Sequence, residues 1–335
     1  MAATVVRAII GGLPAFLVAV AMACGSVPAR AETTWEAYTY NPVATVAAVR
    51  GVDRIIDETE RATDGALKMK LHLGGSLQIN ATNITQAVAD NIIQFADDGF
   101  FTGNIPVGGV MRLPMLIRTE EEYGKAAKIV AGFMAKAYAK KGIVLLGDYT
   151  YPLQVPFSRK KLTSLAEFKG QKLRVTSPEQ GEFLRRFGGS SVTMQPSEVP
   201  SSLDRGVIDG AFTASSGAGY VWRDLVKYNY RFGLNFVNAM IIVNKEAFDA
   251  LTPDTQAKLR RIVAEVTPWT MATMQKEEAE LTDKMAAGGV IVTQAKPEDL
   301  AEAQAKMEPY WNEWAKAHGP DAVEALKQIR AALGR

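Results

Sequence analysis

The chain has 335 residues, and its 38 lysines and arginines nearly balance its 36 aspartates and glutamates. A nucleic-acid partner would require a clustered basic surface, so this balance argues against one. Because Cys24 is the single cysteine and His72 and His318 are the only histidines, the sequence offers no internal disulfide, no cysteine-ligated zinc and no support for a histidine-based triad or metal cluster.

Residues 1–31 have the features of a signal peptide. Arg7 precedes an apolar run from Ala8 to Ala23, and Ala29-Arg30-Ala31 supplies the small residues of a cleavage site. The run is shorter than the roughly 20 residues that a membrane-spanning helix needs. We therefore expect cleavage after Ala31 and export to the periplasm. Lipidation of Cys24 is the alternative, although an aliphatic leucine is missing from the position three residues before it.

The mature chain begins with strands and helices in alternation. We expect strands over 34–40, 67–73 and 92–96, and helices over 45–63 and 84–89. This order predicts an α/β unit. A chain of this length usually forms two domains or lobes.

The alternation continues between residues 165 and 212. Lys172 to Thr176 alternates like a strand, and Ser177-Pro178 starts a helix that ends at Gly188-Gly189. A strand over 190–195, a short helix from Ser197 to about Gly206 and a strand over 207–212 complete the segment. Strands joined through helices imply right-handed crossovers and a parallel sheet.

Arg174 is the candidate ligand-binding residue of this segment. It lies two residues before the end of the expected strand 172–176, and ligands of open α/β sheets bind beyond the carboxyl ends of the strands. A guanidinium group offers a planar fork of donors to both oxygens of a carboxylate. On the residue alone, a surface arginine paired with a neighbouring carboxylate is the more common interpretation, and it is the sequence context that favours a ligand.

Proline-initiated helices follow toward the C-terminus. Thr252-Pro253 opens a long helix with a kink expected at Pro268, and Pro297 and Pro320 open two more. The extended segments 146–155 and 240–244 are candidate hinges. We accordingly expect a first lobe over about 32–153 and 244–295, a second lobe over about 154–243, and C-terminal helices over 296–335.

Two phrases carry a family resemblance. Glu167-Phe-Lys169-Gly170-Gln-Lys172-Leu-Arg174-Val175 is followed by Ser197-Glu198-Val199-Pro-Ser-Ser-Leu203-Asp-Arg-Gly206-Val-Ile-Asp209-Gly210. Both resemble phrases of the solute-binding subunit of tripartite ATP-independent periplasmic (TRAP) transporters, the DctP family. Arg112-Leu-Pro114 and Ile242-Val-Asn244-Lys245 look like further family segments, so the resemblance covers nearly the whole mature chain.

The resemblance implies a periplasmic-binding-protein-like fold: two α/β lobes with mixed sheets, joined by hinge strands and braced by a long helix. It also implies transport without catalysis, a small organic acid ligand and two membrane permease partners. We expect no cofactor and no metal, and we expect a monomer. A periplasmic α/β enzyme and a ligand-sensing subunit are the alternative classes. The enzyme would lack a usable histidine pair, and the adjacent Asp97 and Asp98 should point to opposite faces of a strand.

Site residues follow from the resemblance one at a time. Arg174 matches the family arginine that holds the ligand carboxylate, and Thr213 stands where many members have asparagine. Gln154 stands where sialic-acid binders have a second arginine, which implies that one carboxylate is held. The remaining candidates are Asp97, the loop residues Tyr40 and Asn41, and Tyr151 and Asn238.

The expected ligand is a monocarboxylate with an apolar or aromatic body, such as an aryl or 2-oxo acid. The absent second arginine and the rings of Tyr151 and Trp222 favour this class, although core and interlobe packing is the more common explanation for such rings. A C4-dicarboxylate or a sugar acid is the alternative, because Asn41, Asp97 and Gln154 could bind hydroxyl groups.

Overall fold

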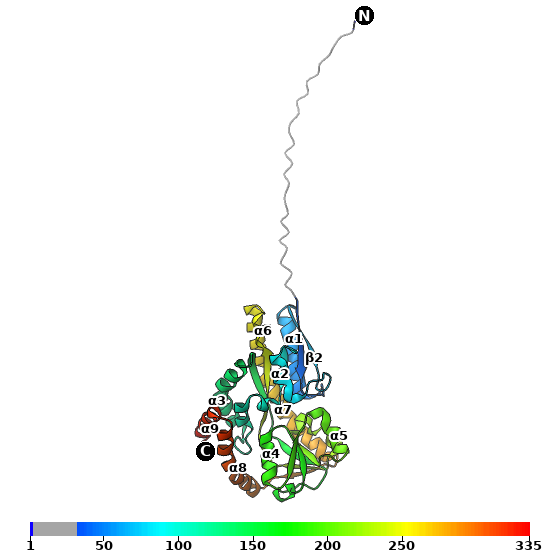
Figure 1. Cartoon of the computed structure of the whole chain (residues 1–335). Coiled ribbons are helices and arrows are strands. Elements are labelled where there is room, and N and C mark those ends of the chain that lie inside the picture. Colours follow the sequence, from blue (N-terminus) through cyan, green and yellow to red (C-terminus); the bar gives the residue numbers. More distant parts are fainter. Residues whose placement is uncertain (3–31) are drawn as a thin grey trace. The chain divides into compact units, whose positions relative to one another are not determined.

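Two mixed β-sheets organise the chain in the computed structural model, which describes residues 1–2 and 32–335 (Figure 1). The first sheet has the order β2-β1-β3-β10-β4, and its strands are β1 (Thr33–Thr39), β2 (Leu67–His72), β3 (Phe95–Asp98), β4 (Ile143–Tyr151) and β10 (Val237–Asn244). Strands β1, β2 and β3 run parallel, and β10 lies antiparallel between β3 and β4. The expected signal peptide and cleavage site lie outside the described residues, apart from residues 1–2.

The second sheet has the order β11-β9-β5-β8-β6-β7. Its strands are β5 (Val155–Ser158), β6 (Lys172–Val175), β7 (Ser190–Thr193), β8 (Gly210–Thr213), β9 (Tyr228–Arg231) and β11 (Ile291–Gln294). Strand β6 pairs in parallel with both β7 and β8, as the repeated strand-helix pattern predicts. The two mixed sheets confirm the predicted fold class.

Nine α-helices occur among the described residues. They are α1 (Ala47–Ala62), α2 (Ile84–Ala89), α3 (Glu120–Ala139), α4 (Pro178–Arg186), α5 (Val199–Asp204), α6 (Lys245–Asp249), α7 (Pro253–Ala287), α8 (Pro297–Ala317) and α9 (Pro320–Leu333). Helices α4, α7, α8 and α9 begin at the expected prolines, whose fixed φ suits the first helical turn. Ser177 precedes α4 but does not cap it: its buried hydroxyl has no hydrogen-bond partner within residues 32–335.

The chain crosses between the sheets at two short segments, 152–154 and 232–236. They are hydrogen-bonded to each other, since the Gln154 amide donates to the Asn235 carbonyl (2.8 Å) and the Leu234 amide donates to the Gln154 carbonyl (2.7 Å). The expected hinge 146–155 contains the first of these segments together with the end of β4, whereas 240–244 lies within β10 of the first sheet. Strand β10 is buried along its whole length between β3 and β4.

Helix α7 contacts elements that belong to, or lie beside, each of the two sheets. It packs against α1 and β4 beside the first sheet, and against the π-helical turn Ser215–Gly219 and β11 of the second. Its helical assignment runs through Pro268 without interruption. Strand β11 follows α7 and pairs with β9, so residues 291–294 belong to the second sheet and not to the expected first lobe, 244–295. Within residues 32–335, no helix is both long and apolar enough to cross a membrane.

Candidate functional site

Arg174 lies on β6 with only 2% of its surface exposed. Its Nε donates to the Met194 carbonyl (2.8 Å) and its Nη1 to the Phe212 carbonyl (3.2 Å). Within residues 32–335, no aspartate or glutamate forms an ion pair with this guanidinium. Desolvation by burial lowers the pKa of Arg174 to about 10, so the side chain stays charged at neutral pH. A buried positive charge without a carboxylate is costly unless a ligand completes the pair.

Two aromatic rings flank the guanidinium group. Its Cζ lies 5.8 Å from the ring centroid of Phe100 and 5.7 Å from that of Trp222, within the range of a cation–π interaction. Phe100 follows β3 of the first sheet, whereas Trp222 follows the π-helical turn beside the second. The guanidinium group is therefore flanked by one residue from beside the first sheet and one from beside the second.

A narrow cavity of about 30 Å³ adjoins Arg174. Its lining combines residues from both sheets and their connections: Tyr40, Asn41, Gly99, Phe100, Tyr151, Gln154, Arg174, Thr176, Pro196, Thr213, Gly217, Ala218, Trp222 and Val237. Arg174 carries the only formal charge in this set. The volume is enough for about two water molecules, so an organic acid can enter only if the walls move apart.

The remaining polar groups of the cavity are neutral. The hydroxyls of Tyr40 and Tyr151 are hydrogen-bonded to each other (2.7 Å). Burial raises the pKa of Tyr151 to about 12 and that of Tyr40 well above its usual value, so both phenols stay protonated. The side-chain Nε2 of Gln154 donates to the Pro152 carbonyl (3.0 Å). The side-chain oxygen of Gln154 accepts no hydrogen bond within residues 32–335. Neutral donors and acceptors thus surround one fixed cation.

Six of the eight expected site residues line this cavity: Arg174, Gln154, Thr213, Tyr40, Asn41 and Tyr151. Asn41 and Thr213 are held by local hydrogen bonds, since Asn41 Oδ1 accepts from the Val43 amide (3.1 Å) and Thr213 Oγ1 accepts from the Ala218 amide (3.3 Å). These contacts restrict the side-chain rotamers before any ligand arrives.

The structure does not bring Asp97 into the cavity. Its side chain is fully buried in β3, where Oδ2 accepts hydrogen bonds from the hydroxyls of Thr39 and Tyr149 (both 2.9 Å). Burial raises the pKa of Asp97 to about 7. Its neighbour Asp98 accepts from the Thr85 hydroxyl and the Phe100 amide, so the two carboxylates have separate partners, as strand alternation predicts.

Asn238 also lies outside the lining of the cavity. Its side-chain oxygen accepts from Arg112 Nε (3.2 Å), and its backbone carbonyl accepts from Arg112 Nη2 (2.5 Å). Arg112 is fully buried and also donates to the Gly99 carbonyl (2.8 Å). Asn238 therefore helps to fix the loop that carries Gly99 and Phe100, and its contribution to the cavity is indirect.

Sequence reasoning missed Thr176 and Phe100 as lining residues, and it left Trp222 undecided between packing and ligand contact. Thr176 follows Arg174 by two positions, so the strand pattern placed both on one face. No local signal identifies Phe100, because its position depends on the Arg112 contacts described above. Within the described part of the chain, no group of histidine, cysteine, aspartate and glutamate side chains could hold a metal ion.

The sequence and the structure are similar to those of known proteins. The sequence profile of the bacterial extracellular solute-binding proteins of family 7 (DctP) matches residues 46–317. The C4-dicarboxylate-binding periplasmic protein DctP of Rhodobacter capsulatus is 23% identical over 317 residues, covering 91% of this chain and 94% of the relative.

Two solved structures are similar over most of the chain. DctP7 of Bordetella pertussis, an extracytoplasmic solute receptor binding pyroglutamic acid, has 26% identity and a TM-score of 0.83, and the match covers 89% of this chain and 99% of that one. DctP6 of the same organism, also a receptor binding pyroglutamic acid, has 25% identity and a TM-score of 0.84 over 89% and 100% of the two chains. These relatives are binding proteins, not enzymes. The chain belongs to family 7 of the bacterial extracellular solute-binding proteins, the DctP family.

Proposed function

We propose that this protein is the periplasmic binding component of a TRAP transporter and that Arg174 holds the carboxylate of a small organic acid. The observation that carries the proposal is the buried guanidinium of Arg174, which has no carboxylate partner within residues 32–335 and adjoins the cavity. A ligand carboxylate would supply the missing negative charge and accept charge-assisted hydrogen bonds. The names of the relatives from Rhodobacter and Bordetella support an acid ligand.

The favoured ligand is a monocarboxylate with a ring or another compact apolar body. Because Arg174 is the only charged residue in the lining, a second carboxylate would find no cation there. Phe100 and Trp222 offer flat apolar surfaces beside the guanidinium, and the Tyr40 and Tyr151 hydroxyls and Gln154 can read a neutral polar group. A C4-dicarboxylate or a sugar acid is the alternative within the same class.

Capture requires movement of the two lobes. The proposed first lobe surrounds the sheet of β1 to β4 and β10, and the second surrounds the sheet of β5 to β9 and β11, with the segments 152–154 and 232–236 as hinges. The ligand would stabilise the closed form because it contacts both lobes at once. The closed, exported protein would then deliver the acid to the two membrane permease subunits without covalent change.

A thermal-shift screen against organic acids tests this proposal. The sharpest pair of probes is pyroglutamate and 2-pyrrolidinone, which share a ring and differ in the carboxylate. At about one hundred times its Kd, a bound acid stabilises the protein by about 2.7 kcal/mol and should raise Tm by several degrees. Succinate and glucuronate test the two alternative classes. If 2-pyrrolidinone stabilised the protein as much as pyroglutamate, the proposed role of Arg174 would be refuted.

A further inference from the structure

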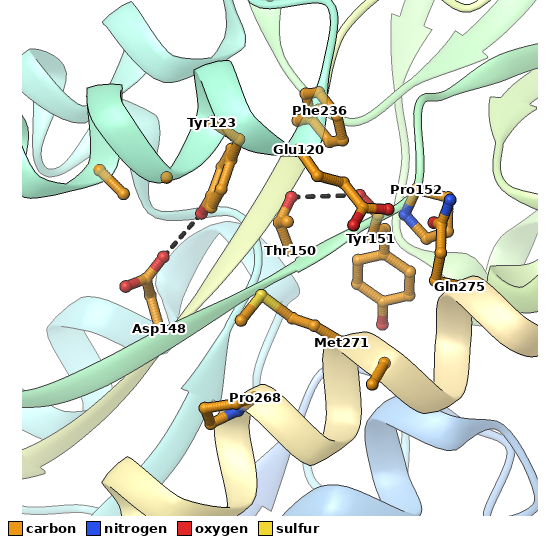
Figure 2. A pocket seen from close by; sticks show the side chains of 13 residues that line it. Glu120, Tyr123, Asp148, Thr150, Tyr151, Pro152, Phe236, Pro268, Met271 and Gln275 are labelled. Atoms are coloured by element: carbon orange, nitrogen blue, oxygen red, sulfur yellow. Dashed lines mark hydrogen bonds between the residues drawn. The ribbon is translucent and has the colours of Figure 1, made fainter.

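A second cavity, of about 390 Å³, lies beside the crossing segments (Figure 2). Helix α3, strand β4, both crossing segments and helix α7 contribute to its walls, through residues such as Tyr123, Thr150, Pro152, Phe236 and Met271. Tyr151 lines this cavity and the cavity of Arg174. The volume lies in the range of small-molecule sites, which is about 300–1,000 Å³. We call this space the hinge cavity.

Asp148 is the half-buried carboxylate in the wall of the hinge cavity. Its Oδ2 accepts a hydrogen bond from the Tyr123 hydroxyl (2.6 Å), which Figure 2 shows as a dashed line. Its carboxylate forms no ion pair within residues 32–335. Asp148 also lines an adjoining space of about 250 Å³, and neither lining contains a lysine, arginine or histidine. Desolvation by burial raises the pKa of Asp148, and the hydrogen bond from Tyr123 offsets only part of this rise.

The surroundings of Asp148 combine this negative charge with apolar and aromatic surface. Tyr123 and Phe236 lie with their ring centroids 5.4 Å apart, and Pro268 and Met271 of α7 face them across the cavity (Figure 2). Glu120, which is exposed at the start of α3, places a second carboxylate in the lining. The basic residue Arg118 lines an adjoining cavity that shares Glu120, Pro152, Phe236 and Gln275 with the hinge cavity. Its guanidinium donates to the Gly233 carbonyl.

The geometry points to a binding site in the hinge cavity for a small organic cation, an ammonium group attached to an apolar or aromatic body. The ammonium group would pair with Asp148 and the body would lie against Tyr123, Phe236 and Met271. The hydrogen bond from Tyr123 uses one carboxylate oxygen and leaves Oδ1 to accept from the ligand. Aromatic faces beside a carboxylate are the surroundings that favour ammonium ions. This site is separate from the acid cavity and does not depend on its assignment.

Ligand-observed NMR and calorimetry with phenethylammonium as the probe test this inference. The neutral 2-phenylethanol and the anionic 3-phenylpropionate are matched in size and differ in charge. We expect saturable binding of phenethylammonium and at least about tenfold weaker binding of both analogues, because the ion pair with a partly desolvated carboxylate is lost. Equal binding of the cation and the neutral analogue would overturn the inference, as would the absence of saturable cation binding.

Two variants locate the site. Asp148→Asn removes the charge while its amide oxygen can still accept from Tyr123, and it should weaken phenethylammonium binding about tenfold or more. Ala272→Phe, at an exposed position of the lining, should block the cavity without disturbing the core. Asp249→Asn on α6 is the control, because it removes an exposed carboxylate outside the hinge cavity. Circular dichroism and Tm confirm that each variant is folded. Unchanged cation affinity in Asp148→Asn would also contradict the assignment.

Discussion

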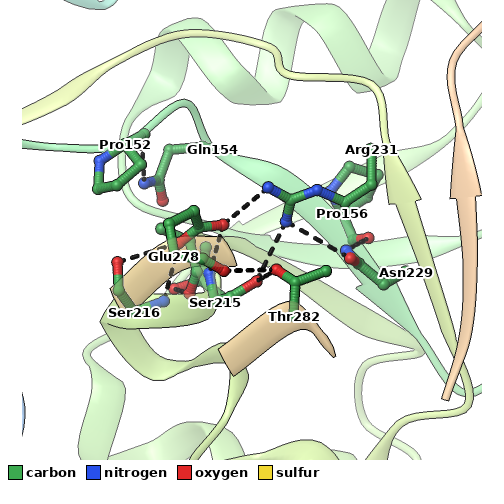
Figure 3. A network of polar contacts seen from close by, with 11 residues as sticks. Pro152, Gln154, Pro156, Ser215, Ser216, Asn229, Arg231, Glu278 and Thr282 are labelled. Atoms are coloured by element: carbon green, nitrogen blue, oxygen red, sulfur yellow. Dashed lines mark hydrogen bonds and ion pairs between the residues drawn. The ribbon is translucent and has the colours of Figure 1, made fainter. Parts of the chain in front are cut away.

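Two arginines near the second sheet, Arg174 and Arg231, have contrasting surroundings. Arg231 ends β9, and its Nη2 forms an ion pair with Glu278 Oε1 of α7 (2.8 Å). Its Nη1 donates to the Ser215 hydroxyl (3.1 Å), and Glu278 accepts further hydrogen bonds from the Ser215 and Ser216 amides (3.1 and 2.8 Å), as Figure 3 shows. Arg174 is more deeply buried and has only carbonyl groups as acceptors.

We interpret this difference as that between an arginine that holds the fold together and one that, in the proposed function, binds the ligand. The pair of Arg231 and Glu278 is complete, and it joins α7 to β9 and to the π-helical turn Ser215–Gly219. The charge of Arg174 has no such partner within residues 32–335, so carbonyl groups and aromatic rings offset its desolvation only in part, and we propose that a ligand anion completes the pair. Substitutions at the two sites should therefore affect different properties: ligand affinity at Arg174 and stability at Glu278.

The largest expected effect is the loss of acid binding in Arg174→Ala. Removing one partner of a buried ion pair costs about 3–5 kcal/mol, and micromolar binding amounts to only about 8 kcal/mol. Calorimetry with the acid identified by the screen should show affinity at least a hundredfold weaker. Arg223→Ala is the control, because Arg223 is partly exposed, stacks on Tyr220 and is not among the residues that line the cavity. Binding by Arg174→Ala within a few fold of wild type would show that another group holds the carboxylate.

Like Arg174, Asp97 is a buried charged residue without an ion-pair partner within residues 32–335. Its pKa of about 7 in the folded protein exceeds the ordinary value of 3.8, because burial disfavours the charged form. The protonated acid therefore adds stability that is fully present below about pH 4 and is lost as pH rises through 7. A shift of this size corresponds to a few kcal/mol.

Urea unfolding between pH 4 and pH 8 measures this effect. Wild type should lose stability across the range relative to Asp97→Asn, which does not titrate at this position. Part of the slope should persist in the variant, because burial also raises the pKa of Asp98, to about 6. Asp224→Asn, at an exposed position, should leave the slope unchanged. Identical slopes in wild type and Asp97→Asn would show that Asp97 is not titrating in this range.

A smaller effect on stability is expected from Glu278→Gln. The glutamine can still accept hydrogen bonds from the Ser215 and Ser216 amides, but Arg231 loses its negative partner. Because Arg231 retains some solvent contact, we expect a loss of about 2 kcal/mol in the free energy of unfolding, measured with denaturant. Glu265→Gln breaks an exposed pair with Arg261 on the same helix and should cost less than about 0.5 kcal/mol. Equal losses of unfolding free energy in the two variants would show that the pair of Arg231 and Glu278 contributes no more to stability than an exposed ion pair.

Much of the fold could be predicted from sequence because its signals are local. Proline positions mark the starts of α4, α7, α8 and α9, and alternation along 172–176 places Arg174 on one face of β6. The pairing of β10 could not be predicted, because this segment looks like an extended connector in the sequence and its partners β3 and β4 are distant along the chain. Ile291 is exposed and β11 lies at a sheet edge, so its pairing with β9 left little trace in the hydrophobic pattern.

The residues of the candidate site could likewise be predicted only where local sequence signals mark them. Arg174, Gln154 and Thr213 could be found because they lie in or near recognisable family phrases. The direction of the Asp97 side chain depends on Thr39 and Tyr149, which come from two other strands and which no local pattern connects to it. Phe100 and the hinge cavity likewise depend on packing between distant segments.

The smallest expected effect concerns a hydrogen bond between the two lobes. Gln195, which follows β7, accepts from the Ala81 amide beside the first sheet (3.2 Å). The contact can form only while the lobes are close together, so Gln195→Ala should shift the equilibrium toward the open form. One hydrogen bond contributes about 0.5–1.5 kcal/mol, which predicts acid affinity weaker by about two- to tenfold.

Small-angle scattering on the acid-free protein gives an independent measure of this shift, since a larger open fraction increases the radius of gyration. Gln328→Ala is the matched control, because Gln328 lies exposed on α9 and bonds only to Glu324. Acid should return Gln195→Ala to the compact form at saturation, because the ion pair with Arg174 is stronger than the lost hydrogen bond. If the variant bound acid as tightly as wild type, closure would be determined by the ligand contacts alone.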